Sequence, residues 1–361
     1  MCTLSVKLML RYNKNMKNKY LLRMAISLLG AIILFVLVVN NSWMYKSPVA
    51  KVVEVHNHGN TQAIEVRLEN GRDKGKLLHI INKYDKSKAY DEQYYKHDYV
   101  FLNDEYSGIT GVKRDYWVAT VFLVLLASLI VIGGKKGTYT SLCVLGNIAL
   151  FGLIIYMNIR GFDILHMTVA GVVVFTFFVL LVSDGISHRM MISFAATLLT
   201  TLLLSALIML LIWNTDIDYD FLHFLPEPFT KTDANHFFLA QIIIGCLGAI
   251  IDVSVTITAA SMELVERTPD IGLKALLSSV RKVADDINGT MISVVLLTNI
   301  AYTLPIFLIS MSNEISFRTV ISHDVYFYIV RSLSGMLSII VAILVSLFVT
   351  SLVARKELKH D

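Results

Sequence analysis

The stretch "FFLAQIIIGCLGAIIDVSVTITAASM", residues 237–262, decides the fold of this chain. Nearly all of its side chains are apolar or small, and Asp252 is the one carboxylate among them. A run of about 20 apolar residues is long enough to cross the roughly 30 Å hydrocarbon core of a bilayer. The stretch therefore predicts a transmembrane helix that carries an acidic group inside it.

Similar apolar runs recur along the whole chain. The 361 residues are 55% hydrophobic and 17% charged, with a mean hydropathy of +0.62, whereas soluble domains are about 25% charged. This composition predicts an α-helical polytopic membrane protein with about eight transmembrane helices. The predicted spans are residues 22–41, 116–133, 140–158, 163–183, 190–213, 237–262, 291–311 and 329–353.

Basic residues collect on one side of these spans. Lysine and arginine are abundant in the N-terminal tail 1–21, in the C-terminal tail 355–361 and after the sixth span, and Lys135, Lys136 and Arg189 follow the second and fourth spans. The loop after the fifth span is acidic instead. Positive charge favours the cytoplasmic side of a membrane. We therefore expect a protein of the cytoplasmic membrane with both termini in the cytoplasm and the first span kept as an uncleaved anchor.

Residues 44–114 are the one long hydrophilic segment, and their pattern is that of β-strands. "AKVVEVHN" and "TQAIEVRLENG" alternate apolar and polar residues, and Asn70-Gly71 is a hairpin signal. We expect a small extracytoplasmic β domain, a barrel or a sandwich, between the first two transmembrane helices. Its tyrosines would suit a polymer or lipid headgroups, but an ordinary solvated surface is the favoured explanation; they are Tyr90, Tyr94, Tyr95 and Tyr99.

Asp252 belongs to a stripe of small and polar residues on its predicted helix. Steps of three or four residues from it reach Gln241, Gly245, Gly248, Thr256, Ala259 and Glu263. Glycines at this spacing let a second helix approach closely, so Gly245 and Gly248 are predicted helix-packing residues and Asp252 is expected to point into the bundle. An aspartate in mid-helix costs about 2.5–3.5 kcal/mol of insertion free energy, which favours an ion or proton site over a structural hydrogen bond.

A second polar cluster follows on the cytoplasmic side, in "RTPDIGLKALLSSVRKVADDINGTM", residues 267–291. Thr268-Pro269-Asp270 is a helix start, and the pattern after it predicts an amphipathic helix at 269–287 lying at the membrane surface. Asn288-Gly289 is expected to break this helix before the next span. The predicted ion or substrate site comprises Asp252, Thr256, Glu263, Asp286 and Thr290.

These two segments resemble the YibE/F-like family of bacterial membrane proteins. The family pattern G-x-x-G-A-x-x-D-V with a downstream E-L, followed by D-I-x-G-T-M, is matched here at Gly245, Gly248, Ala249, Asp252, Val253, Glu263, Leu264, Asp286, Ile287, Gly289, Thr290 and Met291. Asp285 stands where the family usually has arginine. The resemblance implies the membrane topology, and the departures from the pattern indicate a diverged or paired paralogue.

Three classes of function compete. A transporter or permease is favoured by Asp252, and because the chain lacks a phosphate-binding G-x-x-x-x-G-K-[ST] loop, its energy source would be an ion gradient or a separate ATPase. The alternative is a scaffold or sensor whose β domain binds a ligand or partner. An enzyme is disfavoured because the chain has neither H-E-x-x-H nor G-x-S-x-G. We expect no catalytic residues, no metal, no cofactor and no nucleic acid; the expected partners are the lipid bilayer and a homo-oligomer or paralogous membrane protein.

Overall fold

The computed structural model describes residues 24–85, 91–214, 230–268 and 271–357. The chain divides into two compact units, Met1–Ser141 and Leu142–Asp361. The predicted tail 1–21 and most of the acidic loop after the fifth span lie outside the described residues, as do Tyr90 and the last four positions of the C-terminal tail.

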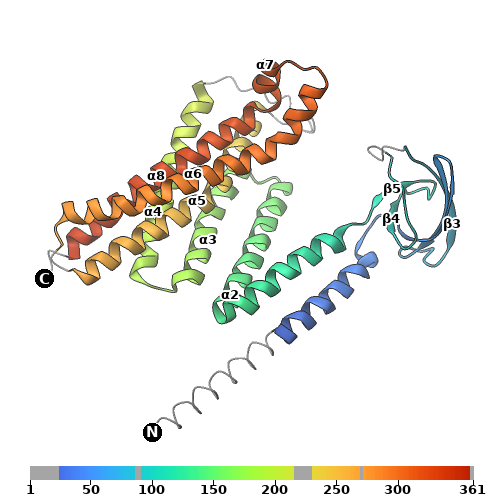
Figure 1. The fold of residues 1–361 in the computed structure, drawn as a ribbon, viewed down its shortest axis with the longest axis horizontal. Coiled ribbons are helices and arrows are strands. Elements are labelled where there is room, and N and C mark those ends of the chain that lie inside the picture. Colours follow the sequence, from blue (N-terminus) through green and yellow to red (C-terminus); the bar gives the residue numbers. More distant parts are fainter. Residues whose placement is uncertain (1–23, 86–90, 215–229, 269–270, 358–361) are drawn as a thin grey trace, which may run out of the picture. The chain divides into compact units, whose positions relative to one another are not determined.

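The first unit contains one antiparallel sheet of five strands in the order β3-β2-β1-β4-β5 (Figure 1). A register shift between Val52 and Glu54 bends β1, as bulges do, and one face of the sheet covers its own apolar core. The prediction of a barrel or sandwich is wrong for the described residues, because β3 and β5 do not pair to close the sheet and no second sheet faces it. The strands are β1 (Val49–His58), β2 (Thr61–Leu68), β3 (Leu77–Lys83), β4 (Tyr99–Leu102) and β5 (Ile109–Val112).

Two turns hold the start of this sheet in place. β1 and β2 are joined through Gly59 and Asn60, and Gly59 has a φ of +63°, which glycine adopts without strain. Asn70 does more than mark a turn. Its side-chain oxygen accepts a hydrogen bond from the backbone N–H of Val49, and its amide nitrogen donates to three carbonyl oxygens of the incoming chain, those of Ser42, Tyr45 and Ser47.

A fully buried lysine joins the sheet to the helices beside it. The ammonium of Lys113 lies 2.9 Å from the Asp115 carboxylate and donates to the carbonyl oxygen of Val38, at the end of the helix Met24–Val39. It also lies 5.6–6.0 Å from three tyrosine ring centroids, those of Tyr45, Tyr99 and Tyr116. These contacts satisfy a charge that would otherwise be costly to bury.

Helix α2 (Asp115–Ile159) is two helical segments joined at a sharp kink. Gly134 has a φ of +58°, and a Cβ on Gly137 would lie 1.8 Å from the carbonyl oxygen of Leu129. The kink therefore needs glycine at both positions. Its place agrees with the break between the predicted spans 116–133 and 140–158.

The second unit is a helical bundle around α5. Figure 1 shows α4, α5, α6 and α8 running side by side, and α5 packs against α3, α4, α6 and α8. Hydroxyls lie inside this packing: Ser346 on α8 donates to Ser254 on α5 at 3.2 Å, the small polar contact that transmembrane helices favour. The elements are α3 (Ile164–Asp184), α4 (His188–Asn214), α5 (Lys231–Arg267), α6 (Leu273–Ser312), α7 (Phe317–Thr319), η2 (Val320–Asp324) and α8 (Tyr326–Glu357).

Six helices in the described residues are long and apolar enough to cross a membrane, namely α2, α3, α4, α5, α6 and α8. The chain has the architecture of a multi-pass membrane protein. The predicted break at Asn288-Gly289 is wrong, because α6 runs without interruption from Leu273 to Ser312 and includes both residues. A single glycine lowers helix stability by only about 1 kcal/mol, which packing of α6 against α5 and α8 offsets. The helix predicted from residue 269 thus starts at Leu273 and continues directly into the next span.

Candidate functional site

Helix α5 has a buried face and an open face. Its apolar side chains form the centre of the core, while the polar stripe predicted around Asp252 lies on the open side. Gln241, Gly245, Gly248, Asp252 and Glu263 are all exposed. The expectation that Asp252 points into the bundle is wrong for the single chain. Buried isoleucines and leucines of α5, such as Ile242, Ile250 and Ile257, take the protein-facing side instead.

The described residues show no helix packed closely against Gly245 or Gly248, for which the sequence predicts a helix-packing role. No atom of another helix lies within 4 Å of a Cβ placed on either residue. Other glycines make the close approaches instead. A Cβ on Gly146 would lie 2.5 Å from the Phe178 ring, and one on Gly171 would lie 2.5 Å from Ile154.

Asp252 lies near the middle of α5, between two polar contacts that mark the two ends of this helix. At one end His236 contacts Asp163, and at the other Glu266 contacts Arg189 of α4. The two α5 residues are roughly 30 residues apart, about 45 Å along a helix, and Asp252 is close to the midpoint. Its carboxylate forms no hydrogen bond or ion pair with any described residue.

The other predicted site residues are spread over two helices. Thr256 donates its hydroxyl to the backbone carbonyl of Asp252 at 2.8 Å, and Glu263 pairs with Arg267 at 2.6 Å on the exposed surface. Asp286 and Thr290 are exposed on α6, about four turns from its start, and Asp252 is about four turns from the end of α5. The two groups are therefore at similar heights along adjacent helices, but no described hydrogen bond joins them.

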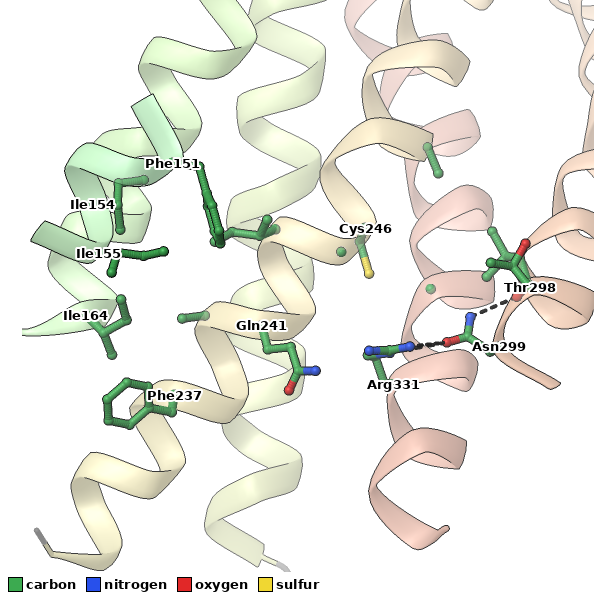
Figure 2. A pocket seen from close by; sticks show the side chains of 16 residues that line it. Phe151, Ile154, Ile155, Ile164, Phe237, Gln241, Cys246, Thr298, Asn299 and Arg331 are labelled. Carbon is green, nitrogen blue, oxygen red and sulfur yellow. Dashed lines mark hydrogen bonds between the residues drawn. The ribbon is translucent and has the colours of Figure 1, made fainter. Parts of the chain in front are cut away.

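A groove of about 530 Å³ lies over the other half of the open face of α5. Figure 2 shows its two sides. Apolar side chains of α2 and α3 lie on one side of α5, and Arg331 of α8 and Asn299 of α6 lie on the other. Gln241 and Gly245 form part of its floor, so the groove continues the polar stripe of Asp252. The apolar side is formed by Phe151, Ile154, Ile155, Ile164 and Phe237.

Arg331 is the cation of this groove. Its guanidinium donates from Nε and Nη2 to the Oδ1 of Asn299, at 3.2 and 2.9 Å. It also lies over the rings of Tyr302 and Tyr328, at 5.2 and 5.7 Å from their centroids. All of these partners are neutral, and Arg331 forms an ion pair with none of the described carboxylates.

A second polar cluster, missed in the sequence, lies between the start of α3 and the first turns of α5. Asp163 caps α3 by accepting from the His166 backbone N–H, and its two oxygens lie 2.8 and 2.7 Å from ring nitrogens of His166 and His236. Burial alone would raise the pKa of Asp163, but the hydrogen bonds from His236 and His166 outweigh it and lower that pKa to about 2. The cap was readable from an aspartate before an apolar run, whereas its contact with His236 required the fold.

Within the described ranges, no group of three or more histidine, cysteine, aspartate or glutamate side chains is placed to hold a metal ion.

Comparison with known proteins identifies the chain. Residues 121–356 match the YibE/F-like protein family, and residues 43–115 match the N-terminal domain of the YibE/F family. No curated protein and no solved structure matches the chain. The first match covers the helices that carry Asp252 and Arg331, and the second covers the sheet. The chain therefore belongs to the YibE/F-like family.

Proposed function

We propose that the protein is a permease of the cytoplasmic membrane that moves its substrate along the open face of α5. The observation that carries this proposal is Asp252, a carboxylate near the middle of a long apolar helix that is exposed and has no partner among the described residues. An aspartate at that depth costs about 2.5–3.5 kcal/mol if lipid surrounds it. A face that carries it is better explained as the lining of an aqueous path.

The polar stripe supports the same proposal. It runs from Gln241 near one end of α5 through Gly248 and Asp252 to Glu263 at the other end. Polar groups thus run along most of the helix. Their position between α2 on one side and α6 and α8 on the other would leave a path open on the remaining side. We propose that a second copy or a paralogous membrane protein closes it.

The proposed topology has eight spans with both termini in the cytoplasm. The helix Met24–Val39 and the two segments of α2 would add two spans to the six apolar helices. An even number agrees with the basic residues at both ends of the sequence. The sheet would then lie outside, and Arg331 would lie in the outer half of the membrane.

The test begins with a strain that lacks the gene. Its growth is compared across metal salts, organic acids, cationic peptides and pH values, and the condition that separates it from the parent is then used for complementation. We expect the wild-type protein to restore growth and Asp252→Asn to fail while inserting normally. Asp104→Asn, at an exposed carboxylate next to β4, is the matched control and should restore growth. Full complementation by Asp252→Asn would refute the permease proposal.

The scaffold or sensor alternative is favoured by one observation, the buried Lys113 contact that ties the sheet to helix ends on both sides. Such a joint would pass a binding event at the sheet to the helices. In that case removal of the sheet, residues 47–112, would abolish complementation and Asp252→Asn would not. The two variants together separate the two functions.

A further inference from the structure

The groove beside α5 holds a positive charge that forms no ion pair with any described carboxylate. Arg331 is partly buried, and its contacts are one amide oxygen and two tyrosine rings. A guanidinium has five N–H donors, and described residues accept from its Nε and Nη2 only. Its remaining donors therefore point to a ligand that the described residues do not supply.

Asn299 fixes how the guanidinium is presented. Its amide nitrogen donates to the carbonyl oxygen of Val295 one turn earlier at 2.8 Å, which leaves its Oδ1 to face Arg331. Two N–H groups on one edge of Arg331 are held by this single oxygen. The other donors of the planar guanidinium remain available for paired hydrogen bonds to a phosphate, the geometry for which arginine is best suited.

The rest of the groove is suited to hydrocarbon. Opposite Arg331 the lining is aromatic and aliphatic, and Phe151 and Ile155 are exposed on the outside of the bundle, where acyl chains lie (Figure 2). The volume of about 530 Å³ lies within the 300–1,000 Å³ range of small-ligand sites. Arg331 is near the start of α8, and Tyr302 and Tyr328 beside it are residues typical of the headgroup layer.

We propose that this groove binds an anionic phospholipid, with its phosphate on Arg331 and the upper part of an acyl chain against Phe151, Ile154 and Phe237. Gln241 adds an amide at the edge of the headgroup position. A soluble phosphate compound would use Arg331 but would leave the apolar wall uncovered. The lipid accounts for both sides of the groove. This inference goes beyond the proposed transport and does not require it, because the contacts that carry it do not include Asp252.

The experiment is native mass spectrometry of the full-length protein in detergent, with equal amounts of phosphatidylglycerol and phosphatidylcholine added. We expect the wild type to retain phosphatidylglycerol preferentially and Arg331→Gln to lose that preference by about ten-fold, the value of one charge-assisted hydrogen bond. Arg160→Gln is the matched control: Arg160 also lies over a tyrosine, Tyr156, at 5.2 Å, but neither residue lines the groove. It should bind as the wild type does.

Three results would overturn the proposal. They are equal retention of the two lipids by the wild type, unchanged preference in Arg331→Gln, and displacement of phosphatidylglycerol by an equal concentration of glycerol 3-phosphate, which would indicate a soluble ligand. The first and third need no variant, so the proposal stays testable if Arg331→Gln does not fold. Asp252→Asn should bind lipid normally. Lipid preference without Asp252-dependent growth would refute transport alone, and the reverse would refute the lipid site alone.

Discussion

The ammonium of Lys113 and the carboxylate of Asp115 are 2.9 Å apart, with the lysine side chain fully buried and the aspartate side chain 27% exposed. The two side chains differ in the other hydrogen-bond partners that each one has. Asp115 also accepts from the Tyr45 hydroxyl at 2.7 Å and from the Asn41 amide at 3.0 Å. Lys113 has only a carbonyl oxygen and aromatic rings besides its carboxylate.

This inequality predicts different costs for removing either charge. Asp115→Asn leaves an uncompensated buried ammonium and should lower the free energy of unfolding by about 3–5 kcal/mol. Lys113→Met leaves a carboxylate that keeps other donors and some water, and should cost only about 1–2 kcal/mol. Thermal unfolding of both variants in detergent measures the difference. Equal losses of unfolding free energy in the two variants would contradict the claim that an unpaired Lys113 ammonium is costlier than an unpaired Asp115 carboxylate.

Asp252 is expected to disfavour membrane insertion of its helix although the function of the protein requires it. Asp252→Leu removes a carboxylate from an apolar helix and should favour membrane insertion by about 3 kcal/mol. The same variant should fail to restore growth of the deletion strain. Expression level and melting temperature, measured beside complementation, give both quantities. A variant that is both less stable and inactive would indicate a structural role for Asp252 instead.

Gly248 is expected to mark a surface that another chain covers. Because a Cβ at Gly248 meets no atom within 4 Å in the single chain, Gly248→Leu should fold normally. If a second copy packs on this face, the same variant should lose association, as read by chemical cross-linking in membranes. Gly171→Leu is the opposite control, since a Cβ there would lie 2.5 Å from Ile154. Gly171→Leu should lower the free energy of unfolding and should have no direct effect on association between chains.

The lowered pKa of Asp163 predicts how the free energy of unfolding depends on pH. Its pKa in the folded protein is about 2, below the ordinary 3.8, so its contribution is present above pH 3.8 and is lost as pH falls toward 2. After allowance for solvent screening of a partly exposed pair, the contribution is about 1 kcal/mol.

Asp163→Asn separates the charge from the helix cap. Asparagine caps helices as well as aspartate does, so this variant should lose only the charge contribution and should unfold with a weaker pH dependence between pH 4 and 2. Asp163→Ala should lose about 1 kcal/mol more. The measurement is thermal unfolding over that pH range. An unchanged pH dependence in Asp163→Asn would show that His236 does not stabilise the carboxylate.

The order of elements could be read from the sequence because it depends on long apolar runs and alternating strands. The runs predicted the cores of α3, α4, α5 and α8, and the alternation in "AKVVEVHN" and "TQAIEVRLENG" predicted the first two strands of the sheet. The break expected at Asn288-Gly289 failed because a local glycine signal is weak beside the packing of a long helix against two neighbours.

The side of α5 that faces the rest of the bundle could not be predicted from the sequence in the same way. A stripe of glycine and polar residues is equally suited to a contact within one chain or between chains, and only the positions of α3, α4, α6 and α8 decide which side of α5 they cover. Arg331 was visible as a charge near the start of a span. The sequence could not show that all partners of Arg331 are neutral, because Asn299 and Tyr302 are distant from it in the sequence.

The two contacts at the ends of α5, His236 with Asp163 and Glu266 with Arg189, have a mechanical consequence. Both tie α5 to the α3–α4 hairpin, one near each end, and the buried hydrogen bond from Ser346 to Ser254 ties α8 to the same helix. These four helices should therefore shift as one rigid frame that carries both Arg331 and Asp252, so that a movement within the bundle would have to come from α6.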